Sequence, residues 1–214
     1  MTRVLVVAKA PVPGLVKTRL ARDIGPERAA EVAAASLLDT LAACADAVGP
    51  QQCHLSLAGD LDDAVHGERI RRRLADWWVT PQVGDGFAER LAHAHAEGPG
   101  PVVQVGMDTP QVTPALLLDV AAGLTEHPGV LGPAEDGGWW VLALRDPAAA
   151  RVLAEVEMST PTTYDDTRAA LSAAGVPLGS APVLRDVDTL ADAEAVAAAA
   201  PETHFSHTWR AVTA

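Results

Sequence analysis

Three basic side chains lie close together in a short loop that follows an apolar strand pattern at residues 3–8. Lys9, Lys17 and Arg19 belong to the segment Lys9–Leu20, whose two prolines and one glycine shape the backbone. Lys9 and Lys17 are the only lysines in a chain of 214 residues with a formal net charge of -12. A lysine supplies a point charge and an arginine a planar fork, and both bind phosphate groups. The loop therefore predicts a phosphate or diphosphate site, although a solvated basic loop would have the same composition.

Several better-known motifs are absent from this region of the sequence. A P-loop requires Gly, four residues and then Gly-Lys-Ser/Thr, whereas Val16 precedes Lys17 here. No Gly-x-Gly-x-x-Gly follows the first strand pattern, which disfavours a dinucleotide oxidoreductase. The chain also lacks the Gly-x-Ser-x-Gly turn of serine hydrolases. Phosphate binding by this loop would therefore depend on its lysine and arginine side chains.

Aspartates follow two other apolar segments of the chain. Asp108 comes after the segment 101–105, and Asp186 and Asp188 follow the segment 176–184. Two or three carboxylates that converge at strand ends would suit Mg²⁺, which binds carboxylate oxygens together with substrate phosphates. Helix capping is the alternative, because Thr109 or Asp108 can cap a turn and Thr189 begins a capping-box pattern. The sequence leaves the two interpretations open.

Two polar turns complete the set of candidate site segments. Asp136 precedes Gly137 and Gly138, which permit positive φ angles and a close approach of the backbone to a ligand. A plain hairpin turn would contain the same residues. Gln82 and Asp85 lie in a similar polar loop that follows the strand pattern at 77–81.

The elements that must position these residues alternate between strand and helix patterns. Apolar runs predict strands at 3–8, 52–58, 77–81, 101–105, 129–131, 139–144 and 176–184. The segments between them predict helices at 26–47, 62–76, 87–97, 113–125, 147–156 and 162–174, with a last helix after 189. This alternation indicates an α/β fold with a mostly parallel central sheet and helices on both faces. We expect one domain over residues 1–200 and a C-terminal tail, 201–214, for which the sequence indicates no definite structure.

Composition excludes several classes of protein. The acidic balance argues against nucleic-acid binding, which needs a basic face to displace counterions. No run of about 18 apolar residues occurs, so we expect no membrane insertion. Cys44 and Cys53 do not make a disulfide framework, and no cleavable leader pattern precedes the first strand, which together predict a cytoplasmic protein. The sequence does not indicate an oligomeric state.

Taken in order, six segments of the chain resemble one protein family. They are Lys9–Leu20, Gln82–Arg90, Gly106–Pro110, Gly132–Gly138, Ser159–Thr160 and Asp186–Thr189. Together they resemble the radical-SAM/selenodomain-associated transferases of the nucleotide-diphospho-sugar transferase (GT-A) superfamily. The basic loop is also similar to that of 2-phospholactate guanylyltransferase, and the Asp-Val-Asp-Thr segment to one in molybdenum-cofactor guanylyltransferase. Trp139 and Met158 depart from the Tyr and Trp that relatives usually carry.

The resemblance implies a Rossmann-like GT-A fold with a nucleotide bound over the first strand ends. It implies Asp108 as the main ligand of Mg²⁺ or Mn²⁺, with Asp188 or Asp186 as the second. Asp136 and Asp108 are the implied catalytic residues. The candidate nucleotide-binding residues are Lys9, Lys17, Arg19, Gln82, Asp85 and Gly137.

Three functions are consistent with these residues. The first is a glycosyltransferase that uses a nucleotide-sugar donor, a divalent metal and a small-molecule acceptor. The second is a guanylyltransferase-like nucleotidyltransferase that joins a nucleoside triphosphate to a phosphorylated small acceptor. The long basic loop suits a triphosphate, but the Gly-x-Gly-x-Arg loop of typical sugar nucleotidyltransferases is missing. The third is a nucleotide-binding protein without catalytic activity.

Overall fold

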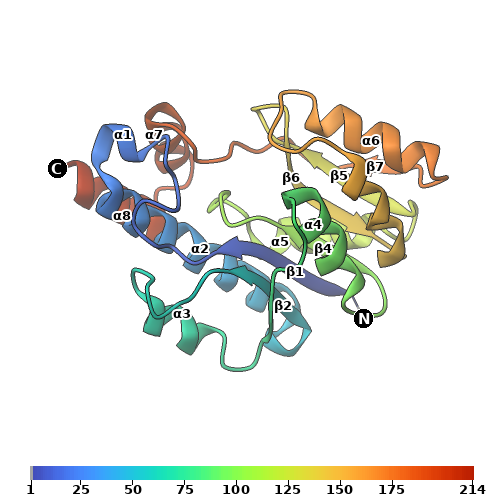
Figure 1. Cartoon of the computed structure of the whole chain (residues 1–214), viewed down its shortest axis with the longest axis horizontal. Coiled ribbons are helices and arrows are strands. Elements are labelled where there is room, and N and C mark those ends of the chain that lie inside the picture. The colour runs from blue at the N-terminus through green and yellow to red at the C-terminus, as the bar shows by residue number, and fades with distance from the viewer. Residues whose placement is uncertain (1) are drawn as a thin grey trace.

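The computed structural model describes residues 2–214 and has a seven-stranded sheet at its centre (Figure 1). The strands are β1 (Arg3–Lys9), β2 (Cys53–Ala58), β3 (Trp78–Pro81), β4 (Val102–Val105), β5 (Gly129–Pro133), β6 (Trp139–Leu144) and β7 (Leu178–Ser180). They are ordered β3-β2-β1-β4-β6-β5-β7 across the sheet. Only β6 runs antiparallel to its neighbours, β4 and β5. The predicted mostly parallel α/β sheet is thus confirmed.

The central strand β1 shows why its sequence is apolar on both faces. Val4, Val6 and Ala8 pack into one core cluster, whereas Leu5 and Val7 pack into another. Successive side chains of a strand point to opposite faces, so these two clusters are the two faces of the sheet. Parallel strands covered on both faces read as continuous apolar runs, as this one does.

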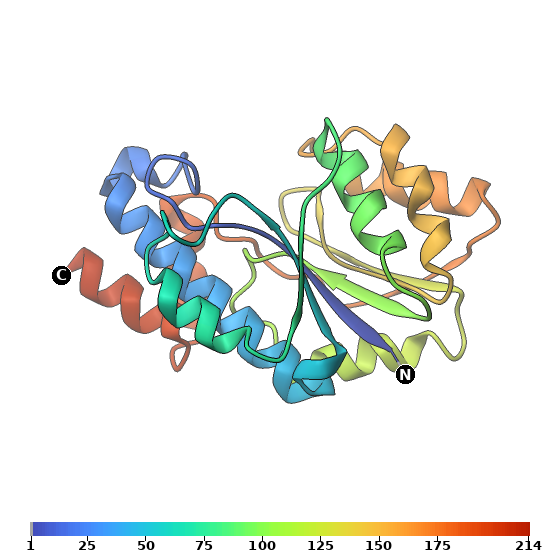
Figure 2. The same ribbon diagram turned by 60° about the horizontal axis from the view of Figure 1, so that its bottom comes forward.

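Helices cover both faces of the sheet, as Figure 2 shows. One face carries residues of α2 (Pro26–Val48), α3 (Gly67–Arg73) and α5 (Pro114–Gly123). The other carries residues of α4 (Phe87–Ala96), the 3₁₀ helix η2 (Pro147–Glu155) and α6 (Thr163–Ala173). The remaining helices are α1 (Ala21–Ile24), η1 (Pro50–Gln52), α7 (Leu190–Ala199) and α8 (His204–Thr213). None of the helices formed within residues 2–214 is both long and apolar enough to cross a membrane.

Local structure differs from the sequence patterns in several places. The helix expected at 62–76 is limited to α3, Gly67–Arg73, and the sequence patterns do not predict the short helix α1. The strand expected at 176–184 is limited to Leu178–Ser180, because Pro177 and Pro182 flank it and proline cannot donate to a sheet ladder. The segment 201–214, for which the sequence indicates no definite structure, contains α8, and a residue of α2 caps the first turn of this helix. The Asp39 carboxylate of α2 accepts hydrogen bonds from the backbone amides of His204 and Phe205.

A third, smaller core cluster joins the C-terminal helices to two candidate site segments. Phe205 and Trp209 of α8 pack with Val32 of α2, and the same cluster buries Leu20 and Val187. Leu20 is the last residue of the basic loop, and Val187 lies between Asp186 and Asp188. The C-terminal helix therefore helps to hold both segments in place.

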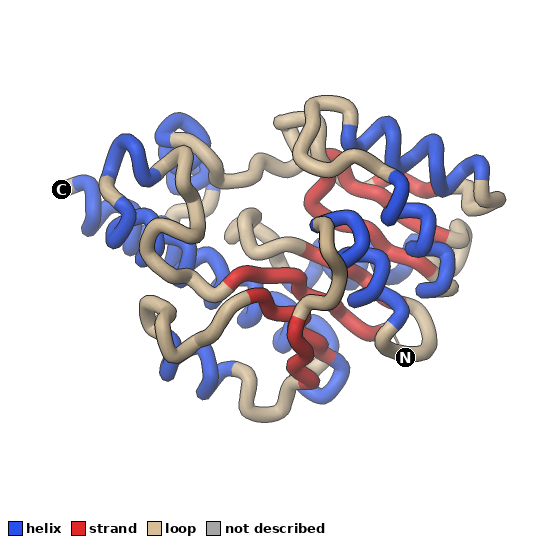
Figure 3. The backbone as a smooth tube through the Cα atoms, viewed as in Figure 1, coloured by secondary structure: helices blue, strands red, loops and turns tan. Residues whose placement is uncertain are grey.

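The sheet order also determines where a ligand can enter. β1 lies between β2 and β4, so the chain leaves β1 in one direction to form β2 and returns on its other side to form β4. Figure 3 shows the loops that follow β1 and β4 at the same edge of the sheet. Ligands of open α/β sheets bind in the crevice that forms at such a switch point.

We expect Trp209→Ala to lower the free energy of unfolding by about 3–5 kcal/mol, the usual cost of truncating a buried Trp. Trp209 is 5% exposed within the third cluster. Urea unfolding followed by circular dichroism measures the change. Leu190→Ala, on the exposed side of α7, is the matched control and should change stability by less than about 0.5 kcal/mol. Equal effects of the two substitutions would contradict the role given to α8.

At the opposite end of β1, a buried polar network surrounds His54. Arg3 donates to Nδ1 of His54 at 2.5 Å, and Nε2 lies 2.8 Å from the Thr80 hydroxyl, which donates to Glu97. The Trp78 ring stacks on the imidazole with centroids 4.0 Å apart. Because an arginine can only donate, this arrangement requires a neutral imidazole with its proton on Nε2. Burial, and then the charge of Arg3, lower the pKa of His54 to about 3.

This histidine should make the folded state sensitive to acid. Its pKa is near 6.5 in an unfolded chain, so below that pH the unfolded state binds a proton that the folded state rejects. We therefore expect the His54 contribution to lower stability between pH 6.5 and 4 by up to about 1.4 kcal/mol per pH unit. His54→Gln should show a correspondingly shallower slope in urea unfolding across this range. His207→Gln on the exposed side of α8 should keep the wild-type slope, and an unchanged slope in His54→Gln would refute the assignment.

Candidate active site

The ammonium group of Lys17 lies between two carboxylates from distant parts of the chain. Its Nζ atom is 2.7 Å from Oδ1 of Asp108 and 3.2 Å from Oδ1 of Asp188, and the side chain is only 4% exposed. Burial acts to lower the pKa of Lys17, but the two carboxylates outweigh it and raise that pKa above its ordinary value. Lys17 is therefore a charged, buried cation that ties together the segments after β1, after β4 and before α7.

Two residues at the site have a backbone conformation that is unusual for their type. Lys17 has a φ of 48° and Ser159 a φ of 64°, in the left-handed region that favours glycine. Such conformations cost about 1–3 kcal/mol each and cluster where function requires a side chain in a set position. At Lys17 the strained backbone accompanies a buried charge, and both features point to a functional residue.

The segment that carries Asp188 is fixed from two sides. The backbone amide of Val187 donates to the carbonyl of Asp108 at 2.9 Å, while the Val187 side chain is buried in the third core cluster. Helix α7 is capped by a capping box between Thr189 and Asp192. The cap of α7 is therefore Thr189, and the Asp188 carboxylate is left to contact Lys17 and Arg19.

Two adjoining cavities meet at this ion cluster. The first has a volume of about 450 Å³ and is lined by the cations Lys9, Lys17, Arg19 and Arg90, so we call it the basic cavity. The second has a volume of about 370 Å³ and lies beyond Asp108 on the β6 side. Residues shared by both linings are Val7, Arg19, Phe87, Asp108, Ser159 and Asp188. A group transferred between two ligands would therefore cross this shared boundary.

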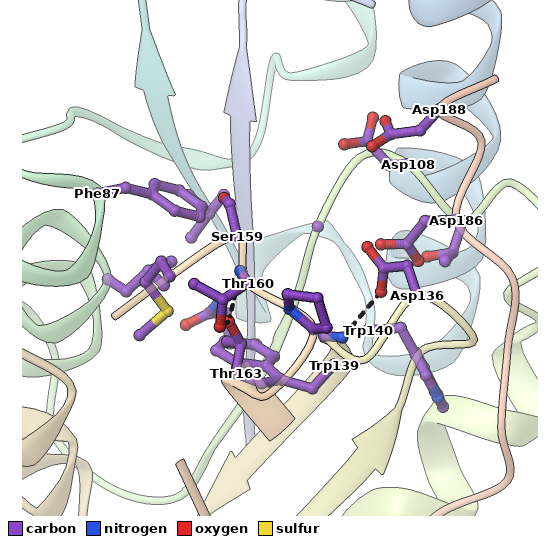
Figure 4. A pocket seen from close by; sticks show the side chains of 18 of the residues that line it. Phe87, Asp108, Asp136, Trp139, Trp140, Ser159, Thr160, Thr163, Asp186 and Asp188 are labelled. Carbon is purple, nitrogen blue, oxygen red and sulfur yellow. Dashed lines mark hydrogen bonds between the residues drawn. The ribbon is translucent and has the colours of Figure 1, made fainter. Parts of the chain in front are cut away.

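Four aspartates line the second cavity, which we call the acidic cavity. Figure 4 shows Asp108 beside Asp188 and Asp136 beside Asp186, all along one side of the space. Oδ1 of Asp136 accepts a hydrogen bond from the amide of Gly138 at 2.8 Å. Burial, followed by the charges of Asp108 and Asp136, raises the pKa of Asp186 to about 7. From the sequence, Asp186 is only an alternative metal ligand, whereas the structure places it in the wall beside Asp136.

The facing wall is apolar and hydroxylated. Phe87 of α4 and Ser159 and Thr160 lie across the space from the aspartates (Figure 4). Leu91, Trp139 and Met158 add further apolar surface to the lining. Phe87 has no signal in the sequence beyond its position at the start of a helix, so motif reasoning alone does not find it.

Three predicted nucleotide-binding residues are placed by the structure in different ways. Gln82 lines the basic cavity, and its side-chain amide donates to the carbonyls of Ala8 and Ser56. Asp85 is exposed and lines neither cavity. Gly137 also lies outside both linings. A Cβ atom at Gly137 would lie 2.1 Å from the carbonyl oxygen of Pro161, so this glycine permits the turn to pack against the start of α6.

The carboxylates at the boundary fit one mode of metal binding. Within residues 2–214, no three His, Cys, Asp or Glu side chains are grouped so as to enclose a metal ion. Asp108 and Asp188 nevertheless converge on one cation, and each side chain is 41% exposed toward the cavities. Mg²⁺ is commonly bound by one or two carboxylates together with substrate phosphates, and this pair suits that mode.

Comparison with known proteins establishes the family of this chain. The family model described as "Uncharacterized protein conserved in bacteria (DUF2064)" matches residues 40–160, which is more than half of the chain. The chain therefore belongs to the DUF2064 family. No curated protein matches the sequence.

Solved structures confirm the Rossmann-like GT-A fold. A candidate nucleotide-diphospho-sugar transferase from Desulfovibrio desulfuricans G20 has a TM-score of 0.85 and 24% identity, covering 98% of this chain and 94% of its own. A nucleotidyl transferase from Methanothermobacter thermautotroptrophicus has a TM-score of 0.57 and 17% identity, covering 96% and 99%. Rv0371c from Mycobacterium tuberculosis H37Rv, in complex with manganese, has a TM-score of 0.52 and 20% identity, covering 92% and 98%.

We expect Lys17→Ala and Arg19→Ala each to weaken the binding of GDP and UDP in the presence of Mn²⁺. Losing a charge-assisted hydrogen bond costs about 1.5–3 kcal/mol, which corresponds to roughly ten- to hundredfold in Kd. Isothermal titration calorimetry measures the affinity, and circular dichroism checks that each variant is folded. Arg22→Ala, on α1 and outside both cavities, is the control and should bind as the wild type does. Unchanged affinity in both cavity variants would remove the basic cavity as the anion site.

Proposed function

We propose that this DUF2064 protein is a metal-dependent glycosyltransferase that moves a sugar from a nucleotide diphosphate to a small-molecule acceptor. The observation that carries the proposal is the meeting of a basic and an acidic cavity at Lys17, Asp108 and Asp188. The fold supports it, because a candidate nucleotide-diphospho-sugar transferase has the same fold. Membership in the radical-SAM-associated branch of that superfamily is part of the same proposal.

The basic cavity would hold the nucleotide donor. Lys9, Lys17, Arg19 and Arg90 surround the space in which the diphosphate would lie, and Gln82 lines it near the end of β1. Asp108 and Asp188 would hold Mg²⁺ or Mn²⁺ together with the phosphate oxygens. A divalent cation bound there supplies positive charge that stabilises the leaving diphosphate. Lys17, whose ammonium already lies at the boundary, adds a second positive charge on the same leaving group.

Asp136 is placed to accept the proton of the acceptor. Its Oδ1 is engaged by Gly138, which orients the carboxylate and leaves Oδ2 available in the acidic cavity. In the transfer, the acceptor oxygen forms a bond to the anomeric carbon of the sugar. The bond between that carbon and the phosphate oxygen breaks, and its electron pair leaves with the nucleoside diphosphate. The hydroxyl proton of the acceptor moves to Oδ2 of Asp136.

A second candidate is nucleotidyl transfer from a nucleoside triphosphate to an acceptor. Four cations around the basic cavity suit the higher charge of a triphosphate, and a nucleotidyl transferase shares the fold. The two reactions break different bonds of the donor, and the released product distinguishes them. Glycosyl transfer releases a nucleoside diphosphate, whereas nucleotidyl transfer releases pyrophosphate.

The test incubates the protein and Mn²⁺ with a panel of nucleotide sugars and nucleoside triphosphates, each with a bacterial metabolite extract. We expect nucleoside diphosphate release from at least one nucleotide sugar, measured by a coupled assay. Asp108→Asn should reduce this release to background, and Asp136→Asn should reduce it by about 10²–10⁴-fold, the usual contribution of a general base. Asp119→Asn on the exposed side of α5 is the control. Pyrophosphate release from a triphosphate, with no diphosphate release from any sugar donor, would reject the proposal in favour of the second candidate.

A further inference from the structure

The two cavities differ sharply in their charges. The basic cavity has four cationic side chains against two aspartates, whereas the acidic cavity has four aspartates against Arg19 alone. Arg19 lies at the boundary, is 66% exposed and already pairs with Asp188 at 3.4 Å. Deeper in the acidic cavity, beside Asp136 and Asp186, the lining contains no cation. A phosphate or carboxylate of an acceptor would lie there beside the Asp136 carboxylate, with no cation in that part of the lining to balance its charge.

The acidic cavity also has buried side-chain oxygens that lack hydrogen-bond partners. Thr109 lines it, is only 2% exposed, and has a hydroxyl oxygen without a hydrogen-bond partner within residues 2–214. Oδ1 of Asp186 is likewise buried and unpartnered. Buried polar atoms in proteins are usually hydrogen-bonded, so oxygens left without partners at a cavity wall point to a ligand that supplies hydrogens.

The two tryptophans that line the acidic cavity already donate their indole N–H groups to other partners. Nε1 of Trp139 donates to the Thr167 hydroxyl, and Nε1 of Trp140 donates to the carbonyl of Pro182. Apart from Arg19 at the boundary, the cavity thus offers mainly carboxylate acceptors and neutral hydroxyls such as those of Thr109 and Ser159. An anionic group is itself an acceptor of hydrogen bonds, so it could bond the Thr109 hydroxyl but would give no hydrogen to the carboxylates of Asp136 and Asp186. Hydroxyl and amino groups carry the hydrogens that the wall requires.

We propose that the acceptor of this enzyme is a non-anionic compound rich in hydrogen-bond donors, such as a polyol or an amino sugar. Its hydroxyl or amino groups face Asp136, Asp186 and the buried oxygens, and its apolar side faces Phe87 and Met158. The inference rests on the proposed function, because it assigns the acidic cavity to the acceptor. It also disfavours the second candidate in its guanylyltransferase-like form, which needs a phosphorylated acceptor.

Cysteine labelling tests the charge of each cavity directly. Thr160→Cys places a thiol in the acidic cavity and Thr18→Cys places one in the basic cavity. The native Cys44 and Cys53 are both buried, which limits background labelling. Each variant is treated with a cationic and an anionic methanethiosulfonate reagent of similar size. The labelling rates are divided by those of a small free thiol, and circular dichroism checks the fold.

We expect the Thr160→Cys thiol to prefer the cationic reagent by roughly tenfold or more, because a charged cleft concentrates ligands of opposite sign. The Thr18→Cys thiol should prefer the anionic reagent. Adding Asp186→Asn to Thr160→Cys should reduce the preference of the first thiol. Equal rates for the two reagents, or a preference for the anionic one, at Thr160→Cys would overturn the proposal.

A second measurement identifies the acceptor class by activity. The bacterial extract is passed over an anion-exchange resin, and the flow-through and the eluted anions are assayed separately for acceptor-dependent release of nucleoside diphosphate. We expect the acceptor activity in the flow-through. Activity confined to the eluted anions would overturn the acceptor class while supporting glycosyl transfer. If neither fraction supports release, the proposed function fails, and the labelling rates alone decide the charge and ligand preference of the cavity.

Discussion

The site of this protein is organised around one buried cation. Lys17 sits between Asp108 and Asp188, and among residues 2–214 the exposed Arg19, which pairs with Asp188, is the only other cation in an ion pair with either carboxylate. The interaction spans three segments that are far apart along the chain and meet only at one edge of the sheet. Because a buried charge is tolerated only when paired, the position of Lys17 constrains both aspartates and the loop that carries them. The left-handed backbone of Lys17 is consistent with that constraint, since the surrounding contacts hold a conformation that the residue would otherwise avoid.

The cations and the aspartates of the site lie on opposite sides of this buried ion pair. The chain is acidic overall, yet its two lysines and Arg90 line the basic cavity on one side of Asp108. Asp136 and Asp186 line the acidic cavity on the other side. A donor with a diphosphate and an acceptor with hydroxyl groups have the same asymmetry. Complementary potentials of this kind guide each ligand to its own side and reject ligands of the wrong charge. The reacting bond would then lie where the two potentials meet.

Parts of the structure far from the chemistry maintain this geometry. Helix α8 buries Phe205 and Trp209 against α2, and the cluster they form immobilises Leu20 and Val187, one beside each half of the ion cluster. The backbone bond from Val187 to Asp108 then fixes the spacing of the two carboxylate segments. The site is therefore supported by packing as well as by charge. By contrast, the histidine network lies at the start of β1, away from both cavities, and its contribution is to stability.

How much of this the sequence determined can be judged from particular residues. The strands and helices follow from local periodicity, and the basic residues of the loop Lys9–Leu20 indicate an anion site, because these properties depend on neighbouring residues. The same local patterns could not distinguish Asp188 from a helix cap, or show that Gly137 serves packing rather than the cavity. Lys17 and Asp188 are 171 positions apart, and their meeting depends on the order of the strands and on the packing of α8. Local chemistry therefore specified which residues could act, while only the tertiary structure decided which of them come together, since contacts over such separations arise from the packing of whole elements.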